Sequence, residues 1–290
     1  MRSATFAAVG VALVLIAIKL VAYFMTNSVA MLSTLVDSLL DLGASFINLI
    51  AVRHALVPAD REHRYGHGKA EAIAGLFQAA LIMGSGVFLL FQAAERLYNP
   101  VPISKSDIGI IVMIASIILT ILLVAYQRYV IRRTRSVAIS ADSLHYFGDV
   151  LINGSVMLAL ILDLFFHWPY IDGLFAVLIA LMLLYSAWKI LRTAFAELMD
   201  EELGEEERKN IIDLVTAQPG VIGIHDLRTR RSGQHVFLQM HIDMDGGMSL
   251  KDAHTISEAV ETRLMAEYPE AEAIVHQDPI DINDTRERED

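Results

Sequence analysis

The sequence predicts a membrane protein in two parts: an all-α part with six transmembrane helices, residues 1–198, and a cytosolic α+β part, residues 199–290. Two observations predict this division. Apolar residues make up 54% of the 290 residues, above the roughly 45–50% of soluble domains. From residue 200 onward the chain carries 22 acidic and only 9 basic side chains. Such asymmetry indicates that the two parts occupy different surroundings.

Six apolar segments are long enough to cross a bilayer, whose core of about 30 Å requires roughly 20 residues of helix. They lie at about 4–26, 29–53, 70–96, 107–130, 137–163 and 168–192. A cleaved signal peptide is the alternative for the first segment, but its apolar stretch exceeds the roughly 7–15 residues of a signal core. Basic side chains gather between segments two and three and between four and five, which predicts cytoplasmic termini.

The acidic part changes its periodicity. Residues 205–217 predict a helix that begins with three glutamates, which suit a helix N-terminus. Strands are predicted at 221–230, 235–243 and 271–278, and Ser249 with Asp252 resembles a capping box that opens a helix to about 267. The order αββαβ predicts a small two-layer module with an antiparallel or mixed sheet.

Charge and cysteine content exclude several classes of protein. The net charge of −11 argues against a generic nucleic-acid binder. Because the chain has no cysteine, disulfide scaffolds, cysteine metal sites and thiol catalysis are excluded. A metal site in this protein must use His, Asp, Glu or backbone oxygen.

Acidic residues inside predicted spans are the strongest functional signal. Asp37 and Asp41 share one face of the second segment, and His145 and Asp149 repeat the spacing in the fifth, which also carries Asp142. Each charge at mid-membrane costs on the order of 2.5–3.5 kcal/mol, and no Lys or Arg is expected at matching depth.

Two interpretations of these acids are open. They could form interhelical hydrogen bonds as protonated acids, or three Asp oxygens and one His nitrogen could hold a divalent cation. Four such ligands suit zinc and admit other first-row metals. The second interpretation is favoured, and because protons compete for the same atoms, a site opening alternately to each side would exchange metal for protons.

Two further clusters lie outside the spans. Asp60, His63 and His67 have a spacing that permits a metal site in the link after the second segment, although a solvated loop is the simpler interpretation. Five of the ten histidines fall between residues 225 and 276, which raises the prospect of a metal site in the acidic part. The candidate ligands there are His225, His241, His254, His276 and Asp278.

Several long motifs occur together in order: MLSTLVDSLLDLGAS, PADREHRYGHGKAE, ADSLHYFGDVLIN, and HDLRTR followed by HQDP. Together they resemble the cation diffusion facilitator family, and within it the bacterial zinc and ferrous-iron efflux pumps, over essentially the whole chain. The sequence departs from that pattern by beginning almost inside the first span. The resemblance implies six transmembrane helices, a cytosolic ferredoxin-like domain, and a homodimer in the bacterial inner membrane.

The resemblance also implies roles for particular residues. It implies a transport site at Asp37, Asp41, His145 and Asp149, a loop site at Asp60, His63 and His67, and a binuclear cytosolic site at His225, His241, His254, His276 and Asp278. A contact between Lys69 and Asp200 is implied near the dimer interface. Zinc is implied as transported and regulatory ion, with ferrous iron and cadmium as further substrates.

Three functions are compatible with a membrane protein that carries these clusters. The favoured one is a proton-coupled exporter of divalent metal, which is not an enzyme, with a cytosolic domain that binds metal and regulates transport. A membrane metalloenzyme such as an intramembrane hydrolase lacks the H-E-x-x-H motif and an open ligand position. A metal-sensing module with a membrane anchor would not need six spans with an ionisable cluster.

Overall fold

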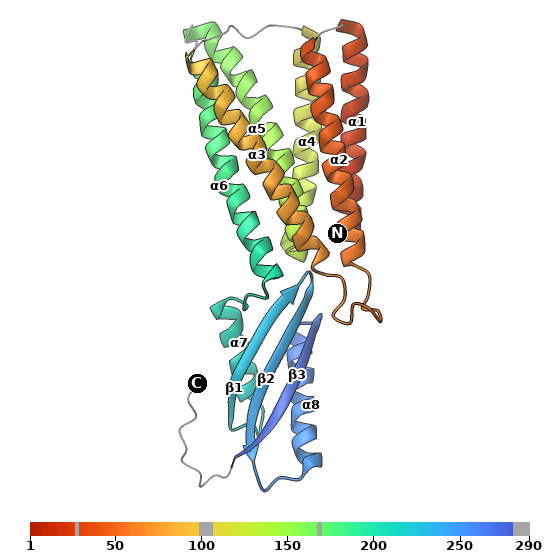
Figure 1. The fold of residues 1–290 in the computed structure, drawn as a ribbon, viewed down its shortest axis with the longest axis vertical. Coiled ribbons are helices and arrows are strands. Elements are labelled where there is room, and N and C mark those ends of the chain that lie inside the picture. The colour runs from red at the N-terminus through yellow and green to blue at the C-terminus, as the bar shows by residue number, and fades with distance from the viewer. Residues whose placement is uncertain (27–28, 99–106, 167–169, 281–290) are drawn as a thin grey trace. The chain divides into compact units, whose positions relative to one another are not determined.

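The computed structural model describes residues 1–26, 29–98, 107–166 and 170–280 (Figure 1). The chain divides into two compact units, Met1–Phe195 and Ala196–Asp290. Each unit is described below by itself.

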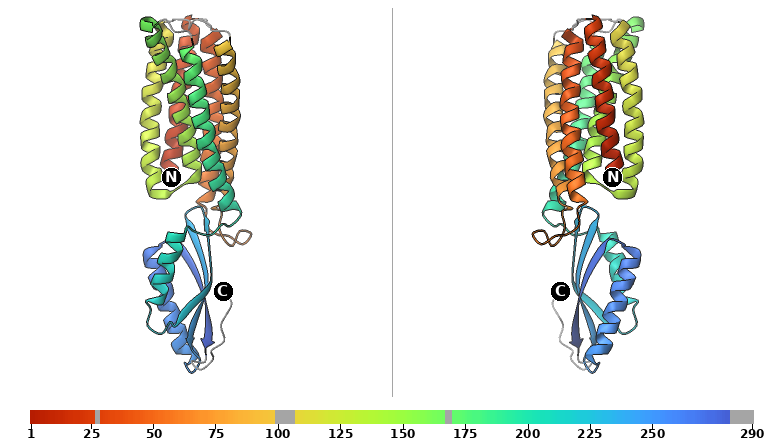
Figure 2. Two further views of the ribbon diagram at one scale, coloured as in Figure 1. Left: turned by 90° about the vertical axis from the view of Figure 1, so that its left-hand side faces the viewer. Right: turned by 90° about the vertical axis from the view of Figure 1, so that its right-hand side faces the viewer.

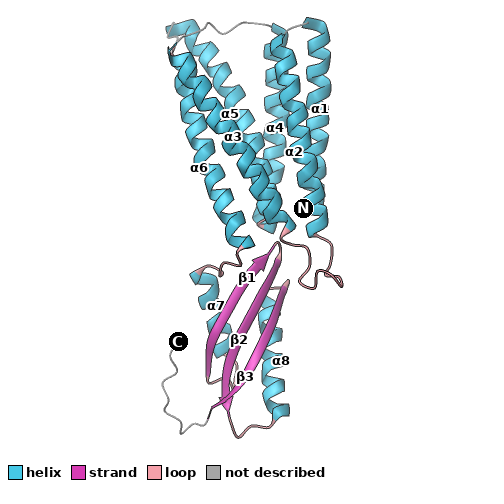
Figure 3. Cartoon of the chain, viewed as in Figure 1, coloured by secondary structure: helices cyan, strands magenta, loops and turns pink. Residues whose placement is uncertain are grey.

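Over the described ranges the first unit is built of long helices that run alongside one another (Figures 1 and 3). They are α1 (Arg2–Thr26), α2 (Val29–Ala55), α3 (Ala70–Tyr98), α4 (Asp107–Thr134), α5 (Val137–Phe166) and α6 (Ile171–Leu198). Within the described residues, each predicted apolar segment is therefore helical, and the last of them begins its helix at Ile171. Of the residues described, α1, α2, α3, α4 and α6 contain stretches long and apolar enough to cross a membrane. The sixth span, in α5, stays a prediction.

The helical unit has small residues inside and large apolar residues outside. Ala4, Ala8 and Ala12 follow one face of α1 and are fully or almost fully buried. Small residues at this spacing let helices approach closely, which is how helices associate in lipid. Phe24 and Phe88, in contrast, are exposed. The apolar outer surface is what a helical bundle solvated by lipid requires.

Helix α5 holds a central place in this unit because it packs against α2, α3 and α4. Tyr146 of α5 is buried together with Ala8 of α1 and with Leu123 and Val124 of α4. Polar side chains on the N-terminal half of α5 are therefore surrounded by other helices.

The second unit has the predicted order αββαβ, with a mixed sheet in the order β1-β2-β3 over the residues described. Its elements are α7 (Glu205–Thr216), β1 (Gly223–Ser232), β2 (His235–Asp245), α8 (Leu250–Glu267) and β3 (Ala271–Ile280). Strands β1 and β2 are antiparallel, and β2 and β3 are parallel. Both helices lie against one face of the sheet (Figure 2). Ser249 caps α8 as predicted, because its hydroxyl accepts from the Asp252 N–H (3.2 Å).

Strict alternation along β2 separates the two faces of the sheet. Leu238, Met240 and Ile242 are buried in the core that the sheet forms with α7 and α8. His241 lies between Met240 and Ile242, and Asp243 directly follows Ile242, so both face away from the helices. The register then sets three imidazoles in one row, because His225, His241 and His276 are Cα partners across the three strands.

Candidate metal centres

The helical unit brings together three of the four predicted transport ligands. Asp41 of α2 and His145 and Asp149 of α5 each offer a ligand atom, and these atoms all lie within 4.8 Å of one another. The Nε2 atom of His145 lies 2.8 Å from Oδ1 of Asp41. His145 and Asp149 are one helical turn apart, so they face α2 together. This convergence from two helices could hold a divalent cation through one nitrogen and two oxygens.

Asp37, the fourth predicted ligand, lies outside this group. It precedes Asp41 by one turn of α2 and is exposed. The expectation that no cation lies at this depth is wrong. Lys19 of α1 donates to the Ser38 hydroxyl (2.6 Å) and to the Thr34 carbonyl (3.2 Å), and it interacts electrostatically with Asp37. The long lysine side chain reaches α2 because α1 packs along that helix.

Asp142 on α5 forms hydrogen bonds to other helices, whereas His145 and Asp149 on the same helix belong to the candidate metal site. Its side chain is buried, and its Oδ1 atom accepts hydrogen bonds from the Ser45 hydroxyl (3.2 Å) and the Gln78 amide (3.1 Å). Its Oδ2 atom accepts from the Gln127 amide (2.7 Å). The carboxylate therefore joins α5 to α2, α3 and α4. Sequence spacing could not reveal this junction, since the three donors lie on three other helices.

The loop between α2 and α3 brings Asp60, His63 and His67 together, again with ligand atoms within 4.8 Å. Nδ1 of His63 and Nε2 of His67 each lie 3.4 Å from an oxygen of Asp60. The backbone N–H groups of His63 (2.6 Å) and Glu62 (2.9 Å) donate to Asp60 Oδ1. Those bonds, that of His63 above all, hold the pKa of Asp60 below its ordinary value. The carboxylate is thus kept in its ligand form.

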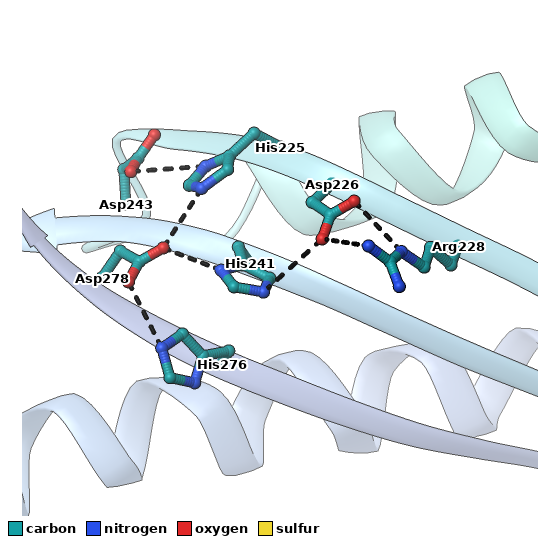
Figure 4. Close-up of polar contacts among 7 residues, drawn as sticks. All are labelled: His225, Asp226, Arg228, His241, Asp243, His276 and Asp278. Carbon is teal, nitrogen blue, oxygen red and sulfur yellow. Dashed lines mark hydrogen bonds and ion pairs between the residues drawn. The ribbon is translucent and has the colours of Figure 1, made fainter. Parts of the chain in front are cut away.

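On the sheet face away from the helices, Asp278 connects three imidazoles (Figure 4). Its Oδ2 atom lies 2.9 Å from Nδ1 of His241 and 3.1 Å from Nε2 of His225. Its Oδ1 atom lies 3.3 Å from Nε2 of His276. The ligand atoms of His225, His241 and Asp278 lie within 4.8 Å of one another, and the His276 ring is 4.5 Å from that of His241.

The charge state of Asp278 follows from these neighbours. Partial burial acts to raise its pKa, but the hydrogen bond from His241 and the nearby imidazoles outweigh burial and lower the pKa. The site therefore offers a carboxylate and two or three imidazoles, a set of ligands that zinc accepts.

His254 does not join the other predicted cytosolic ligands. It lies on α8, which covers the opposite face of the sheet, and its imidazole is 3.4 Å from Glu258 one turn further along. Sequence spacing could not separate it from the other four, because the face that a helix covers is set by tertiary packing.

Two acids beside the cytosolic cluster were missed from the sequence. Asp243 Oδ1 lies 3.5 Å from Nδ1 of His225, and Asp226 Oδ2 lies 3.8 Å from Nε2 of His241 (Figure 4). Asp226 also forms two hydrogen bonds with Arg228 (both 3.1 Å). Asp243 could have been found, since it follows His241 by two residues and so shares its face of the strand. Asp226 could not, because it lies at an irregularity of the β1–β2 register and has a φ of 47°.

Lys69 and Asp200, predicted to meet near a dimer interface, belong to different units. Lys69 directly precedes α3, and Asp200 follows α6 and accepts a hydrogen bond from Arg230 (3.2 Å). Their mutual contact stays a prediction.

Comparison with known proteins identifies relatives over both units. Residues 5–199 match the family model described as the cation efflux transmembrane domain, and residues 203–280 match that of the cation efflux protein, cytoplasmic domain. The cation-efflux pump FieF of Shewanella oneidensis is 45% identical over 98% of this chain and 96% of its own length. FieF of Serratia proteamaculans is 44% identical over 97% and 93%. A solved chain, the zinc form of the zinc transporter CzrB, covers 31% of this chain and 99% of its own length at 30% identity, with a TM-score of 0.28.

Proposed function

The chain belongs to the cation efflux family, and we propose that it exports divalent metal cations from the cytoplasm in exchange for protons. The observation that carries this proposal is the convergence of Asp41, His145 and Asp149 from two helices of a membrane unit. The family supports transport rather than catalysis.

A metal ion accounts for this convergence better than hydrogen bonding alone. Two carboxylates gathered in a lipid-solvated bundle repel each other and lose hydration, and a dication with their imidazole partner offsets both effects. Asp37 lies one turn from Asp41 and would complete four ligands after a small movement of α2. Nitrogen and oxygen ligands in this number suit Zn2+, and they also accept Fe2+ and Cd2+.

Proton exchange follows from the same atoms. A neutral imidazole and ionised carboxylates bind metal, whereas their protonated forms release it. Protons that return across the membrane are driven by about 2.3 kcal/mol per charge for each 100 mV. Opening alternately to each side, the site would couple metal export to proton entry.

We further propose that the protein is a homodimer whose transport is regulated by metal at the cluster around Asp278. We place the protein in the bacterial inner membrane with both termini in the cytoplasm. Zinc at the cytosolic cluster around Asp278 would regulate transport, and Lys69 of one protomer would meet Asp200 of its partner. The match of residues 203–280 to a cytoplasmic domain supports that side for the second unit.

Reconstituted vesicles test the proposal. We expect zinc uptake into vesicles that contain the full chain to require a pH gradient, and Asp149→Asn to reduce uptake to the level of empty vesicles. Asp213→Asn, which removes an exposed acid on α7, is the matched control and should transport as the wild type does. Zinc movement that ignores the pH gradient would refute exchange, and full transport by Asp149→Asn would refute the assigned site.

A further inference from the structure

A third imidazole lies beside the loop cluster. His54 belongs to the last turn of α2, and its ring meets that of His67 edge-on, with centroids 4.5 Å apart and an interplanar angle of 66°. The ring of His63 is also 4.5 Å from that of His67. His54 thus lies directly beside the loop cluster, in ring contact with His67, although its ligand atoms fall outside the group of Asp60, His63 and His67 atoms that lie within 4.8 Å of one another.

The orientation of His67 leaves its Nε2 atom available to bind a metal. Its side chain is only 5% exposed, and its Nδ1 atom lies 3.3 Å from the carbonyl oxygen of Val57. Since a carbonyl only accepts, Nδ1 carries the proton and Nε2 keeps its lone pair. That Nε2 atom faces Asp60. A backbone carbonyl that orients an imidazole in this way is the usual support behind a metal-bound histidine.

The end of α2 positions both His54 and the Val57 carbonyl that orients His67. The N–H of Val57 donates to the carbonyl of His54 (2.9 Å), so one turn of backbone positions His54 and the carbonyl that orients His67. Asp60 is likewise fixed from its own side, because two backbone N–H groups hold one of its oxygens. His54 is exposed, yet its ring lies against a buried imidazole.

We propose that His54 is a fourth ligand of the loop site, which binds zinc through three imidazole nitrogens and one oxygen of Asp60. Four protein ligands make a closed structural zinc site, whereas three with a water leave an open position. This proposal rests on the proposed function, because a closed zinc site in this loop would serve to stabilise a metal transporter.

The fourth ligand changes what the metal connects. Without His54 the ion would be held within the loop alone. With His54 it ties the end of α2 to His67, three residues before α3 begins at Ala70. Asp41 lies on the same α2 helix, about 20 Å from His54 at 1.5 Å per residue. Zinc in the loop would therefore restrain one end of the helix that carries a transport ligand.

The test isolates the loop site in the full chain. In a background with Asp41→Ala, Asp149→Ala, His241→Ala and Asp278→Ala, we expect the protein to bind zinc, and His54→Gln to weaken that binding at least tenfold in competition with a chelator. His235→Gln replaces an exposed histidine of the second unit and should leave the affinity unchanged. Zinc X-ray absorption supplies a second measurement that does not depend on stability, with three imidazoles in the background protein and two after His54→Gln.

Each outcome bears on the proposal. Unchanged affinity together with an unchanged imidazole count in His54→Gln overturns it, as does a background protein that binds no zinc. If only the affinity falls while both proteins show two imidazoles, His54 acts by packing and the proposal is again overturned. Because this chain cannot transport, a failure of pH-driven flux in wild-type vesicles would count against the proposed function and leave this test intact.

Discussion

Asp278 connects imidazoles that come from three different strands, and its lowered pKa keeps its charge constant over the physiological pH range. Burial alone would raise its pKa, but the hydrogen bond from His241 and the neighbouring histidines lower it. The carboxylate is therefore ionised throughout the physiological range and loses its charge only in strong acid. Metal binding at this cluster therefore removes no proton from Asp278 in that range.

This reasoning predicts different pH profiles for two variants of the cluster. Asp278→Asn should weaken zinc binding by about 10- to 100-fold, as the loss of a ligand or its support does. The fall of affinity with decreasing pH should keep its wild-type slope, because Asp278 takes up no proton in this range. His241→Gln should flatten that slope, since one competing imidazole is gone. Zinc titrations of the full chain from pH 5.5 to 8 check both, and a flattened slope in Asp278→Asn would contradict the assignment.

We expect Lys19 to affect metal binding at the proposed transport site. Its charge lies near Asp37 and opposes a bound dication, by about 2–4 kcal/mol for a unit charge roughly 8–15 Å from the dication at an effective dielectric constant of about 20. We therefore expect Lys19→Gln to bind zinc about 30- to 1,000-fold more tightly and to release it more slowly, which lowers flux. Lys19→Arg keeps the charge and is the control. Weaker zinc binding by Lys19→Gln would show that the lysine acts by positioning Ser38.

At the scale of single elements, local sequence patterns predicted the helices and strands whose formation depends mainly on residues close together in the sequence. Helices followed from the length of apolar segments, β2 from the alternation of Leu238, Met240 and Ile242, and the start of α8 from Ser249. Pairings between elements lay beyond those patterns. An irregular register between His225 and Arg228 shifts β1 against β2, so no count along the sequence could place His225 opposite His241.

The candidate sites differ in the same way, because some join residues that are close in the sequence and others join residues that are far apart. Asp60, His63 and His67 lie within eight residues, and the turn that joins them is local, so their grouping could be predicted from spacing. Asp41 and His145 are 104 residues apart, and spacing identified only that each lies on a polar face. Their meeting depends on the packing of α2 against α5. The cost of unpaired acids in a membrane favoured such a meeting and the resemblance implied it, but no local spacing determines it.

The packing of α5 suggests a test of helix assembly. Asp142 accepts three hydrogen bonds from donors on α2, α3 and α4, each worth about 0.6 kcal/mol between helices in a membrane. Asp142→Ala should therefore lower the free energy of unfolding by roughly 2 kcal/mol and leave two glutamine amides without their acceptor. Unfolding in mixed micelles measures the loss. Asp142→Asn keeps the volume of the side chain and one acceptor oxygen, and should lose less. A variant Asp142→Ala as stable as the wild type would mean that these hydrogen bonds do not stabilise the helical unit.

At the scale of the whole molecule, the surfaces of the two units suit different surrounding media, one apolar and one aqueous. The helical unit turns large apolar residues such as Phe24 and Phe88 outward. The second unit has a conventional apolar core and carries most of the negative charge of the chain. An acidic surface raises the local concentration of cations. Composition alone predicted this contrast, because the medium around each unit selects the residues on its surface.

The proposed contact between Lys69 of one protomer and Asp200 of its partner would stabilise the dimer. In a two-fold dimer each contact occurs twice, and an exposed ion pair contributes about 0.2–1 kcal/mol. Lys69→Glu should therefore weaken dimerisation by about 2- to 30-fold, as dilution-dependent energy transfer between labelled protomers would measure. Combining Lys69→Glu with Asp200→Lys should restore the dimer. Because Asp200 also binds Arg230, Arg230→Gln is needed to measure the loss of that pair alone. A double variant no better than the worse single variant would mean that the two residues do not meet.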